Sequence, residues 1–326
     1  MDVSSKQKSI VKNLRPVVLL NTIRKILAIC LIQKIGDKLK SVIPLSQAAY
    51  TKGRSVTEHV FALRTLAEKA IISSECKLTL LMLDMSSAFD TVNRKKLIEI
   101  ISQNLEPEEL NLNKILIEQV ELKVRIAKEL GDPIISNIGV PQGDCLSPIL
   151  FTTYLAYILQ TYEQQQYQTI NFTLSLQYAD DISWISTSQE YVNEIKKELP
   201  PQFRDYNLTV NASKTEEYTI QRKGNGDWRN CKFLGSKLGT REDISNRKHL
   251  SLATFSKISG ILQNKKITTK LQVRVFNVYV TSICLYNSEL WTMTKLLENE
   301  IDVFQRKFLR RILGIKWPEK IRNDEV

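Results

Sequence analysis

The most constraining stretch of the sequence is a pair of adjacent aspartates, Asp180 and Asp181, set between two runs of alternating apolar and polar residues. The alternation covers residues 174–178 before the pair and 182–184 after it. A period of two predicts two β-strands joined by a tight turn. Adjacent carboxylates repel each other, and a divalent cation offsets that repulsion best. The alternative is a solvated Asp-Asp turn, because aspartate favours turns.

A third aspartate, Asp84, ends a continuous apolar run over residues 78–83. Such a run is typical of a central strand that is buried on both faces. A carboxylate at the end of a buried strand is unfavourable unless a partner or a metal compensates it. Asp90 follows shortly afterwards and is most simply the N-cap or first-turn acid of a helix over residues 91–101. Asp84 is therefore the functional candidate and Asp90 the structural one.

The basic charge of the chain is concentrated in its C-terminal third. The whole sequence carries a net charge of +11, and residues 214–326 hold 22 Lys and Arg against 12 Asp and Glu. A polyanionic partner on that third, most simply nucleic acid, explains the excess, and a merely soluble basic surface is the alternative. The densest basic cluster lies on a predicted amphipathic helix over residues 304–313, and its members are Arg306, Lys307, Arg310 and Arg311. A charged solvent face, a membrane surface and a protein partner stay open for this helix.

Cysteine and hydropathy patterns exclude several classes of protein. The five cysteines are scattered without a Cys-x-x-Cys pair, which argues against a zinc site and against a disulfide framework. A reducing compartment, nuclear or cytoplasmic, fits this pattern. The apolar run over residues 17–35 is interrupted by Arg24, Lys25 and Lys34, so it predicts a buried or amphipathic helix and no membrane span.

Two loops carry further candidate residues. Residues 47–55 form a basic, glycine-containing loop in which Lys52 and Arg54 are suited to phosphate, although a solvated loop is the alternative. Residues 136–143 form a Gly/Pro loop that leads into a helix over 146–160; ordinary turn chemistry is the alternative to ligand approach. A helix over 192–199 is predicted to end at Pro200 and Pro201.

Several short motifs occur in a fixed order along residues 14–239, and together they resemble the reverse transcriptase domain of non-LTR (LINE-type) retrotransposons. The matching segments are Arg-Pro-Val-Val-Leu-Leu at 15–20, Gln47 to Ser55, Leu83 to Asp90, Gly139 to Gly143, Tyr178 to Asp181, Asn211 to Lys214 and Phe233 to Gly235. The tail, over residues 286–292 and 309–315, is similar to that family's tail. Each motif is weak alone, and the ordered set is specific.

The resemblance implies an α+β, right-hand polymerase fold with fingers, a palm of antiparallel sheet and helices, and a helical thumb. We assign residues 1–75 to N-terminally abbreviated fingers, 76–240 to the palm with an insert at about 100–135, and 241–326 to the thumb. The implied enzyme is an RNA-directed DNA polymerase that extends a DNA primer on an RNA template. Its implied partners are the RNA–DNA hybrid and deoxynucleoside triphosphates, and its implied cofactors are two Mg²⁺ ions, which Mn²⁺ can replace.

The resemblance also assigns roles to individual residues. Asp84, Asp180 and Asp181 are implied metal ligands, with Asp84 and Asp180 ranked above Asp181. Lys214 is implied to assist the leaving pyrophosphate, with an exposed loop lysine as the alternative. The implied substrate-binding residues are Phe89, Gln142, Gly143, Lys52, Arg54 and Arg15. Phe89 would exclude a ribose 2′ hydroxyl, although a core phenylalanine is the alternative.

The sequence departs from the family's pattern at both ends. Few residues precede Arg15, so no endonuclease-like segment stands before it in the printed sequence, and no Cys/His zinc knuckle follows the reverse transcriptase-like region. The expectation is a fragment or a truncated element copy. Two other hypotheses stay open: a catalytically inactive remnant that only binds nucleic acid, and a retained cellular or intron-type reverse transcriptase.

Overall fold

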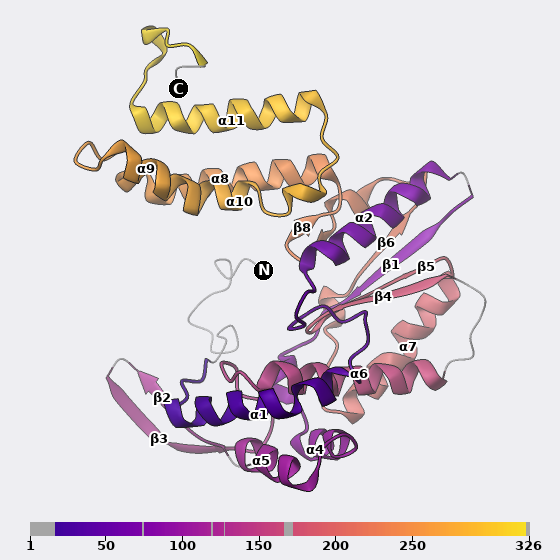
Figure 1. The fold of residues 1–326 in the computed structure, drawn as a ribbon. Helices are drawn as coiled ribbons and strands as arrows, with labels where there is room; N and C mark the ends of the chain where they lie inside the picture. The colour runs from indigo at the N-terminus through magenta and orange to yellow at the C-terminus, as the bar shows by residue number, and fades with distance from the viewer. Residues whose placement is uncertain (1–16, 74, 119, 127, 166–171, 324–326) are drawn as a thin grey trace. The chain divides into compact units, whose positions relative to one another are not determined.

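The computed structural model describes residues 17–73, 75–118, 120–126, 128–165 and 172–323 (Figure 1). The chain divides into two compact units, each of which is described by itself. The first unit comprises Met1–Ser55 and Leu78–Glu217, and the second comprises Val56–Lys77 and Tyr218–Val326. The predicted partition into fingers, palm and thumb stays a prediction.

The first unit combines helices with an antiparallel sheet, which confirms the predicted α+β class. Its helices are α1 (Thr22–Lys40), α3 (Ala88–Thr91), α4 (Arg94–Ser102), α5 (Pro107–Ile117), α6 (Ser147–Gln165) and α7 (Gln189–Asp205), with a short 3₁₀ turn η2 (Ala212–Lys214). Strands β1 (Leu78–Leu83), β4 (Thr173–Tyr178), β5 (Asp181–Ser186) and β6 (Glu216–Ile220) form one sheet in the order β4-β5-β1-β6. Strands β2 (Val120–Ile126) and β3 (Glu129–Ser136) form a separate antiparallel hairpin.

The predicted hairpin and the predicted buried strand are both confirmed, and they are neighbours. Strand β5 pairs with β4 across the Asp-Asp turn and with β1 on its other side, antiparallel in both cases. In β1, Leu81 and Leu83 belong to the main core cluster, as do their β5 partners Trp184 and Ile182. Because side chains alternate along a strand, the positions between them, ending in Asp84, project from the opposite face of the sheet.

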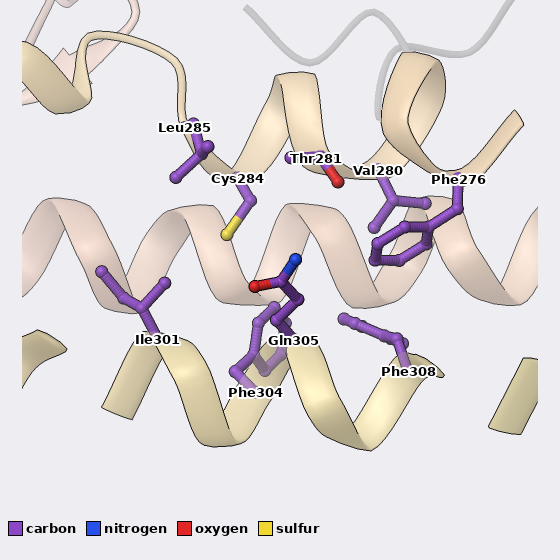
Figure 2. A pocket seen from close by; sticks show the side chains of 9 residues that line it. All are labelled: Phe276, Val280, Thr281, Cys284, Leu285, Ile301, Phe304, Gln305 and Phe308. Atoms are coloured by element: carbon purple, nitrogen blue, oxygen red, sulfur yellow. The ribbon is translucent and has the colours of Figure 1, made fainter. Parts of the chain in front are cut away.

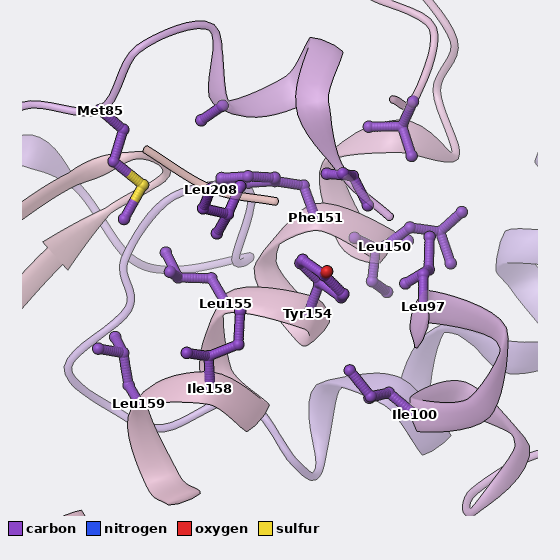
Figure 3. Close-up of a cluster of buried hydrophobic side chains, with 14 of the residues drawn as sticks. Met85, Leu97, Ile100, Leu150, Phe151, Tyr154, Leu155, Ile158, Leu159 and Leu208 are labelled. Atoms are coloured by element: carbon purple, nitrogen blue, oxygen red, sulfur yellow. The ribbon is translucent and has the colours of Figure 1, made fainter. Parts of the chain in front are cut away.

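The main core lies between this sheet and the helices of the first unit (Figures 1 and 3). Helix α6 contributes its centre, where Phe151, Tyr154 and Leu155 are fully buried. Burial raises the pKa of the Tyr154 phenol, which therefore stays protonated and donates a hydrogen bond of 2.7 Å to the carbonyl of Tyr206. The strands β1 and β5, whose ends carry the aspartates, are thus packed against a closely packed core.

Helix α7 does not end where the two prolines predicted. It runs from Gln189 to Asp205 through Pro200 and Pro201. Each proline removes one backbone hydrogen bond. Leu199 before the prolines and Phe203 after them are both fully buried and continue the helix's apolar face. Burial of Phe203 offsets the missing backbone bonds and holds the last turn in place.

The second unit is mainly helical. It contains α2 (Val56–Ile72), the short hairpin of β7 (Lys232–Phe233) and β8 (Ser236–Lys237), α8 (Thr240–Leu262), α9 (Thr269–Phe276), the π-helical segment η4 (Asn277–Thr281), α10 (Ser282–Cys284) and α11 (Lys295–Leu313). Shorter 3₁₀ turns are η3 (Asp227–Asn230), η5 (Ser288–Leu290) and η6 (Trp317–Glu319). Phe255, Phe276 and Phe308 form one aromatic core, with ring centroids 4.6 Å apart for Phe255–Phe308 and 5.8 Å for Phe276–Phe308. The predicted basic amphipathic helix is therefore confirmed as part of α11.

A buried carboxylate ties the second unit together. Asp243 is fully buried and accepts hydrogen bonds from the Arg64 guanidinium at 3.2 Å, the Trp291 indole at 3.0 Å and the Lys237 backbone at 2.9 Å. Burial lowers the pKa of Arg64, although Asp243 opposes that shift. These bonds join α2, α8 and the β7–β8 hairpin through one charged group.

Within the described part of the chain, the helices are too short or too polar for any one of them to traverse a lipid bilayer.

Candidate functional site

The two predicted acidic positions meet at one edge of the sheet. The last pair of the β1–β5 register is Leu83 with Ile182, so the next position sets Asp84 opposite Asp181. Asp180 lies in the two-residue turn beside it and is half-buried, whereas Asp181 is exposed. The register therefore brings Asp181, which sequence reasoning ranked last, across from Asp84.

Lys214 also reaches this edge. Beyond β1, the backbone of Asp84 accepts a hydrogen bond of 2.8 Å from Asn211, and Met85 bridges to Val210. The chain then turns through η2, and the Lys214 ammonium lies 3.0 Å from Asp84 Oδ2. The Asp84 side chain is 19% exposed and that of Lys214 is 38% exposed, so the pair is open to solvent on one side. The lysine is thus an ion-pair partner of the strand-end aspartate.

The Gly/Pro loop docks onto α3, directly after β1. Gly139 donates a 2.8 Å hydrogen bond to the Val92 carbonyl, and Val140 donates one of 2.7 Å to that of Phe89. Gly139 has φ +74°, and a Cβ there would lie 2.5 Å from the Asp90 carbonyl oxygen. Only glycine allows both this backbone conformation and this approach.

The Gln142 amide donates to both carboxylate oxygens of Asp90, at 2.9 and 3.1 Å. Gly143, with φ +110°, packs against the Val18 backbone, and a Cβ there would lie 2.8 Å from its carbonyl oxygen. Asp90 does not cap the helix predicted after it, because Asn93 accepts the amides of Lys95 and Lys96 at the start of α4; it is a first-turn acid, but of α3. Asp90 instead orients Gln142.

Phe89 lies between the core and the site. Its ring stacks on Phe151 of α6 with the centroids 4.2 Å apart, and its side chain is only partly buried. One side of the ring therefore belongs to the core cluster. The partial exposure leaves both predicted roles, core residue and substrate contact, compatible with this position.

The loop over residues 47–55 holds Lys52 and Arg54, whose phosphate-binding role stays a prediction. The Arg54 guanidinium donates to the carbonyl of Leu45, and Lys52 is exposed. Burial raises the pKa of the Tyr50 phenol, and the charge of Asp180 raises it further. The loop thus brings an aromatic hydroxyl close to the acidic turn. Arg15, the remaining candidate, lies outside the described residues.

Two buried polar residues that sequence reasoning missed support the site. Arg94 is 5% exposed, and its guanidinium donates to the carbonyls of Gly139 at 2.7 Å and Ile138 at 3.0 Å. The signal in the sequence was a charged residue on the apolar face of α4, three positions before Leu97. Gln47 is 2% exposed and hydrogen-bonds to the backbone of Ala179 in the acidic turn.

The aspartates at this edge suit a Mg²⁺ ion that is also bound by the phosphates of a substrate. Among the described residues, no group of three or more His, Cys, Asp or Glu side chains is gathered closely enough to enclose an ion. Mg²⁺ is usually held by one or two carboxylates together with substrate phosphates and waters, and seldom by an all-protein cage. Asp84 and Asp181 on adjacent strands, with Asp180 beside them, therefore fit this ion in the presence of a phosphate-bearing substrate.

The second unit has a cavity whose lining is mainly apolar, unlike the acidic edge of the sheet (Figure 2). It has a volume of about 50 Å³ and lies between α11 and the η4–α10 segment, with Phe276, Val280, Cys284, Phe304 and Phe308 in its walls. Burial raises the pKa of the Cys284 thiol, which disfavours the nucleophilic thiolate. Of the residues that the structure describes, those that line this cavity are all uncharged.

The basic cluster on α11 divides into two pairs. Arg306 forms an ion pair of 3.3 Å with Asp302, and Arg310 donates a hydrogen bond of 2.6 Å to the carbonyl of Ile321. Lys307 and Arg311 are exposed, one helical turn apart. The second pair is therefore the one presented to solvent.

Sequence comparison finds relatives over most of the chain. The model of the family "Reverse transcriptase (RNA-dependent DNA polymerase)" matches residues 5–238. A probable RNA-directed DNA polymerase from transposon BS of Drosophila melanogaster is 25% identical over 91% of this chain and 36% of its own length. The RNA-directed DNA polymerase from mobile element jockey of Drosophila funebris is 24% identical over 98% of this chain and 38% of its own length. The chain thus spans less than two fifths of these relatives.

Structural comparison shows a similar fold in telomerase. A telomerase from Candida tropicalis, solved in complex with a fragment of telomeric RNA, superposes with a TM-score of 0.52 at 15% identity. The match covers 87% of this chain and 51% of the telomerase chain. At this identity the likeness concerns the fold alone, and it agrees with the expected right-hand polymerase architecture.

We predict that Gly139→Ala destabilises the first unit more than a matched change at Gly53. Both glycines have positive φ, +74° and +80°, but a Cβ at Gly53 meets nothing within 4 Å. Backbone strain alone should lower the free energy of unfolding by about 1–2 kcal/mol at Gly53. The clash with Asp90 should add about 1–3 kcal/mol at Gly139. Urea denaturation measures both variants, and equal losses would contradict the docking of this loop on α3.

Proposed function

The chain belongs to the reverse transcriptase (RNA-dependent DNA polymerase) family, and from this premise we propose that it copies RNA into DNA. The proposed reaction extends a DNA primer on an RNA template with deoxynucleoside triphosphates. The observation that carries the proposal is the placement of Asp84, directly after β1, and Asp181, at the start of β5, at one edge of the sheet, with Asp180 in the turn beside them. Reverse transcriptases use divalent ions, and Mg²⁺ or Mn²⁺ is the proposed cofactor here.

In this proposal, Asp84, Asp180 and Asp181 hold the ions. When bound, the ions neutralise charge that develops on the attacking and leaving oxygens of the transferred phosphate. The chain's own contribution is rigidity, because β1 and β5 fix the Asp84 and Asp181 backbones in one antiparallel register. A substrate's own phosphates complete the oxygen shell that the protein leaves open.

Lys214 is proposed to act at the leaving group. Its ammonium has three donors and lies 3.0 Å from Asp84 Oδ2. A cation at this position balances the carboxylate charge before substrate enters. When substrate is bound at this edge of the sheet, the Lys214 ammonium can then donate a hydrogen bond to a pyrophosphate oxygen. Lys52 and Arg54 are proposed contacts to triphosphate or template.

Gln142, Gly143 and Phe89 are proposed to form the nucleotide-facing wall. Asp90 holds the Gln142 amide through two hydrogen bonds, which fixes the side chain's orientation. Phe89 is anchored by its stack on Phe151. A ring held from behind in this way can reject an additional hydroxyl sterically, which is the basis for the proposed preference for deoxynucleotides.

The second unit is proposed to hold the template–primer duplex. The C-terminal third carries 22 Lys and Arg against 12 Asp and Glu. Lys307 and Arg311 are exposed along α11, while Phe308 and Ile312 pack inside. Shape and phosphates are what side chains reach on an A-form-like hybrid, so such a helix would bind without sequence preference.

We expect neutralisation of Asp84 or of Asp180, the two metal ligands that were ranked first, to abolish DNA synthesis while the fold persists. Asp84→Asn and Asp180→Asn keep the side-chain volume and remove the charge that holds an ion. Loss of several kcal/mol of charge stabilisation corresponds to a decrease in primer extension of roughly 1,000-fold or more. Asp37→Asn is the control, since the Asp37 side chain is 99% exposed and lies on α1. Extension at the wild-type rate by either site variant would refute the assignment.

Phe89→Val should increase ribonucleotide incorporation relative to deoxynucleotide. The smaller side chain opens the space in which a 2′ hydroxyl would lie, and discrimination by a pocket of this kind changes by roughly 10- to 200-fold. Competition assays with paired nucleotides measure the ratio. Phe203→Val is the control: Phe203 is fully buried in the same core but is not part of the Phe89–Phe151 stack, so its loss should lower stability without changing the ratio. An unchanged ratio in Phe89→Val returns this residue to a core role.

Lys307→Gln with Arg311→Gln should weaken hybrid binding more than Arg306→Gln with Arg310→Gln. Both double variants remove the same charge, but Asp302 and the Ile321 carbonyl already engage Arg306 and Arg310. Removing one cation that binds a phosphate should flatten the logarithmic salt dependence by about 0.9 on duplex DNA. Binding of an RNA–DNA hybrid at several salt concentrations measures the slopes. Equal slopes in the two double variants would argue against α11 as the duplex-facing helix.

A further inference from the structure

Gln47 is a buried polar residue whose side chain bonds to the backbone of the acidic turn. Its Oε1 accepts hydrogen bonds from the amides of Ala179 at 2.9 Å and Ala49 at 3.0 Å. Its Nε2 donates to the carbonyl of Ala179 at 3.4 Å. One amide group thus engages both backbone polar groups of the residue that precedes Asp180.

The backbone around Gln47 is fixed to the hairpin as well. Gln177 donates a hydrogen bond of 2.9 Å to the Ser46 carbonyl, and Ala48 donates one of 3.0 Å to the Gln177 carbonyl. Gln47 and Gln177 therefore form a parallel bridge on β4, an edge strand of the sheet. The segment covers a strand edge that would otherwise be open.

Ala179 needs such support because of its conformation. It has φ +54° and is 6% exposed, although it is not glycine. A left-handed conformation is unfavourable for a residue with a Cβ. Strained residues of this kind persist only where their surroundings hold them. Here the surrounding group is the Gln47 amide, and the residues whose direction it sets are Asp180 and Asp181.

We infer that Gln47 is a positioning residue for the acidic hairpin: its amide holds the left-handed turn at Ala179 and so directs Asp180 and Asp181. The inference rests on the proposed function for the purpose of those two carboxylates. Glutamine suits the position because one amide both accepts and donates. Glutamate could accept but would add a negative charge near the aspartates, and methionine fills a similar volume without hydrogen bonds.

The test combines Gln47→Met and Gln47→Glu with Ala179→Gly. Hydrogen exchange at the Ala179 amide reports the Gln47 bond directly and does not require activity. Mn²⁺ affinity measured with a deoxynucleoside triphosphate present reports the carboxylates and does not require primer extension. Primer extension, where present, separates kcat from the KM for nucleotide. Gln160→Met is the matched control, because Gln160 donates one hydrogen bond of 2.9 Å to the Val42 carbonyl, within the same unit.

In Gln47→Met, we expect faster exchange at Ala179 with unchanged exchange in β1. Mn²⁺ affinity should fall by roughly 10- to 100-fold, the usual effect of removing a group that orients metal ligands. kcat should fall with little change in KM. Ala179→Gly in the Gln47→Met background should restore part of the Mn²⁺ affinity, because glycine adopts the left-handed conformation without strain. Gln47→Glu should lower the affinity less than Gln47→Met does, because a carboxylate still accepts the hydrogen bonds from Ala179 and Ala49.

The outcomes separate this inference from the proposed function. Unchanged exchange at Ala179 and unchanged Mn²⁺ affinity in Gln47→Met would overturn the positioning role, whatever the activity. Equal effects of Gln160→Met would overturn it too, because they would reflect general destabilisation. Faster exchange with weaker Mn²⁺ binding supports the role even where the unmutated chain extends no primer, a result that would count against the proposed function alone.

Discussion

The structure of the site depends on one electrostatic constraint: the carboxylates of Asp84, Asp180 and Asp181 must be held at one edge of the sheet despite their mutual repulsion. Antiparallel pairing of β1 with β5 brings Asp84 opposite Asp181, and the turn adds Asp180 beside them. Lys214 supplies a positive charge 3.0 Å from Asp84. Divalent ions with substrate phosphates would supply the remainder. The site therefore concentrates carboxylates at one edge of the sheet.

Rigidity at this edge comes from groups that carry no reaction chemistry. The Gly/Pro loop is held to α3 by backbone hydrogen bonds, and the buried guanidinium of Arg94 gathers its carbonyls. The acidic turn is held from its other side by Gln47. Behind both stands the core around α6, with Phe151 stacked on Phe89. Displacement of any of these supports would move the carboxylates or the nucleotide-facing wall, which links packing directly to the proposed catalysis.

Local sequence patterns predicted the main strands and helices, and the resemblance predicted the family. Features that depend on tertiary contacts could not be predicted. The β1 strand and the acidic hairpin were predictable because a continuous apolar run and a two-residue period are strong signals. The resemblance to the reverse transcriptase domain of non-LTR retrotransposons is confirmed, and with it the fold class. The path of α7 through Pro200 was not predictable, because burial of Phe203 overrides proline's local effect. Nor was Gln47, whose partner Ala179 is 132 residues away.

The measurement that tests the central claim most directly is primer extension by the unmutated chain on an RNA template, with Mg²⁺ present or chelated. A DNA primer annealed to RNA should lengthen in steps set by the template and only in the presence of the ion. Hybrid binding measured on the same sample shows that the chain is folded and engaged. Binding of the hybrid without any Mg²⁺- or Mn²⁺-dependent extension would contradict the account and identify a chain that grips nucleic acid without copying it.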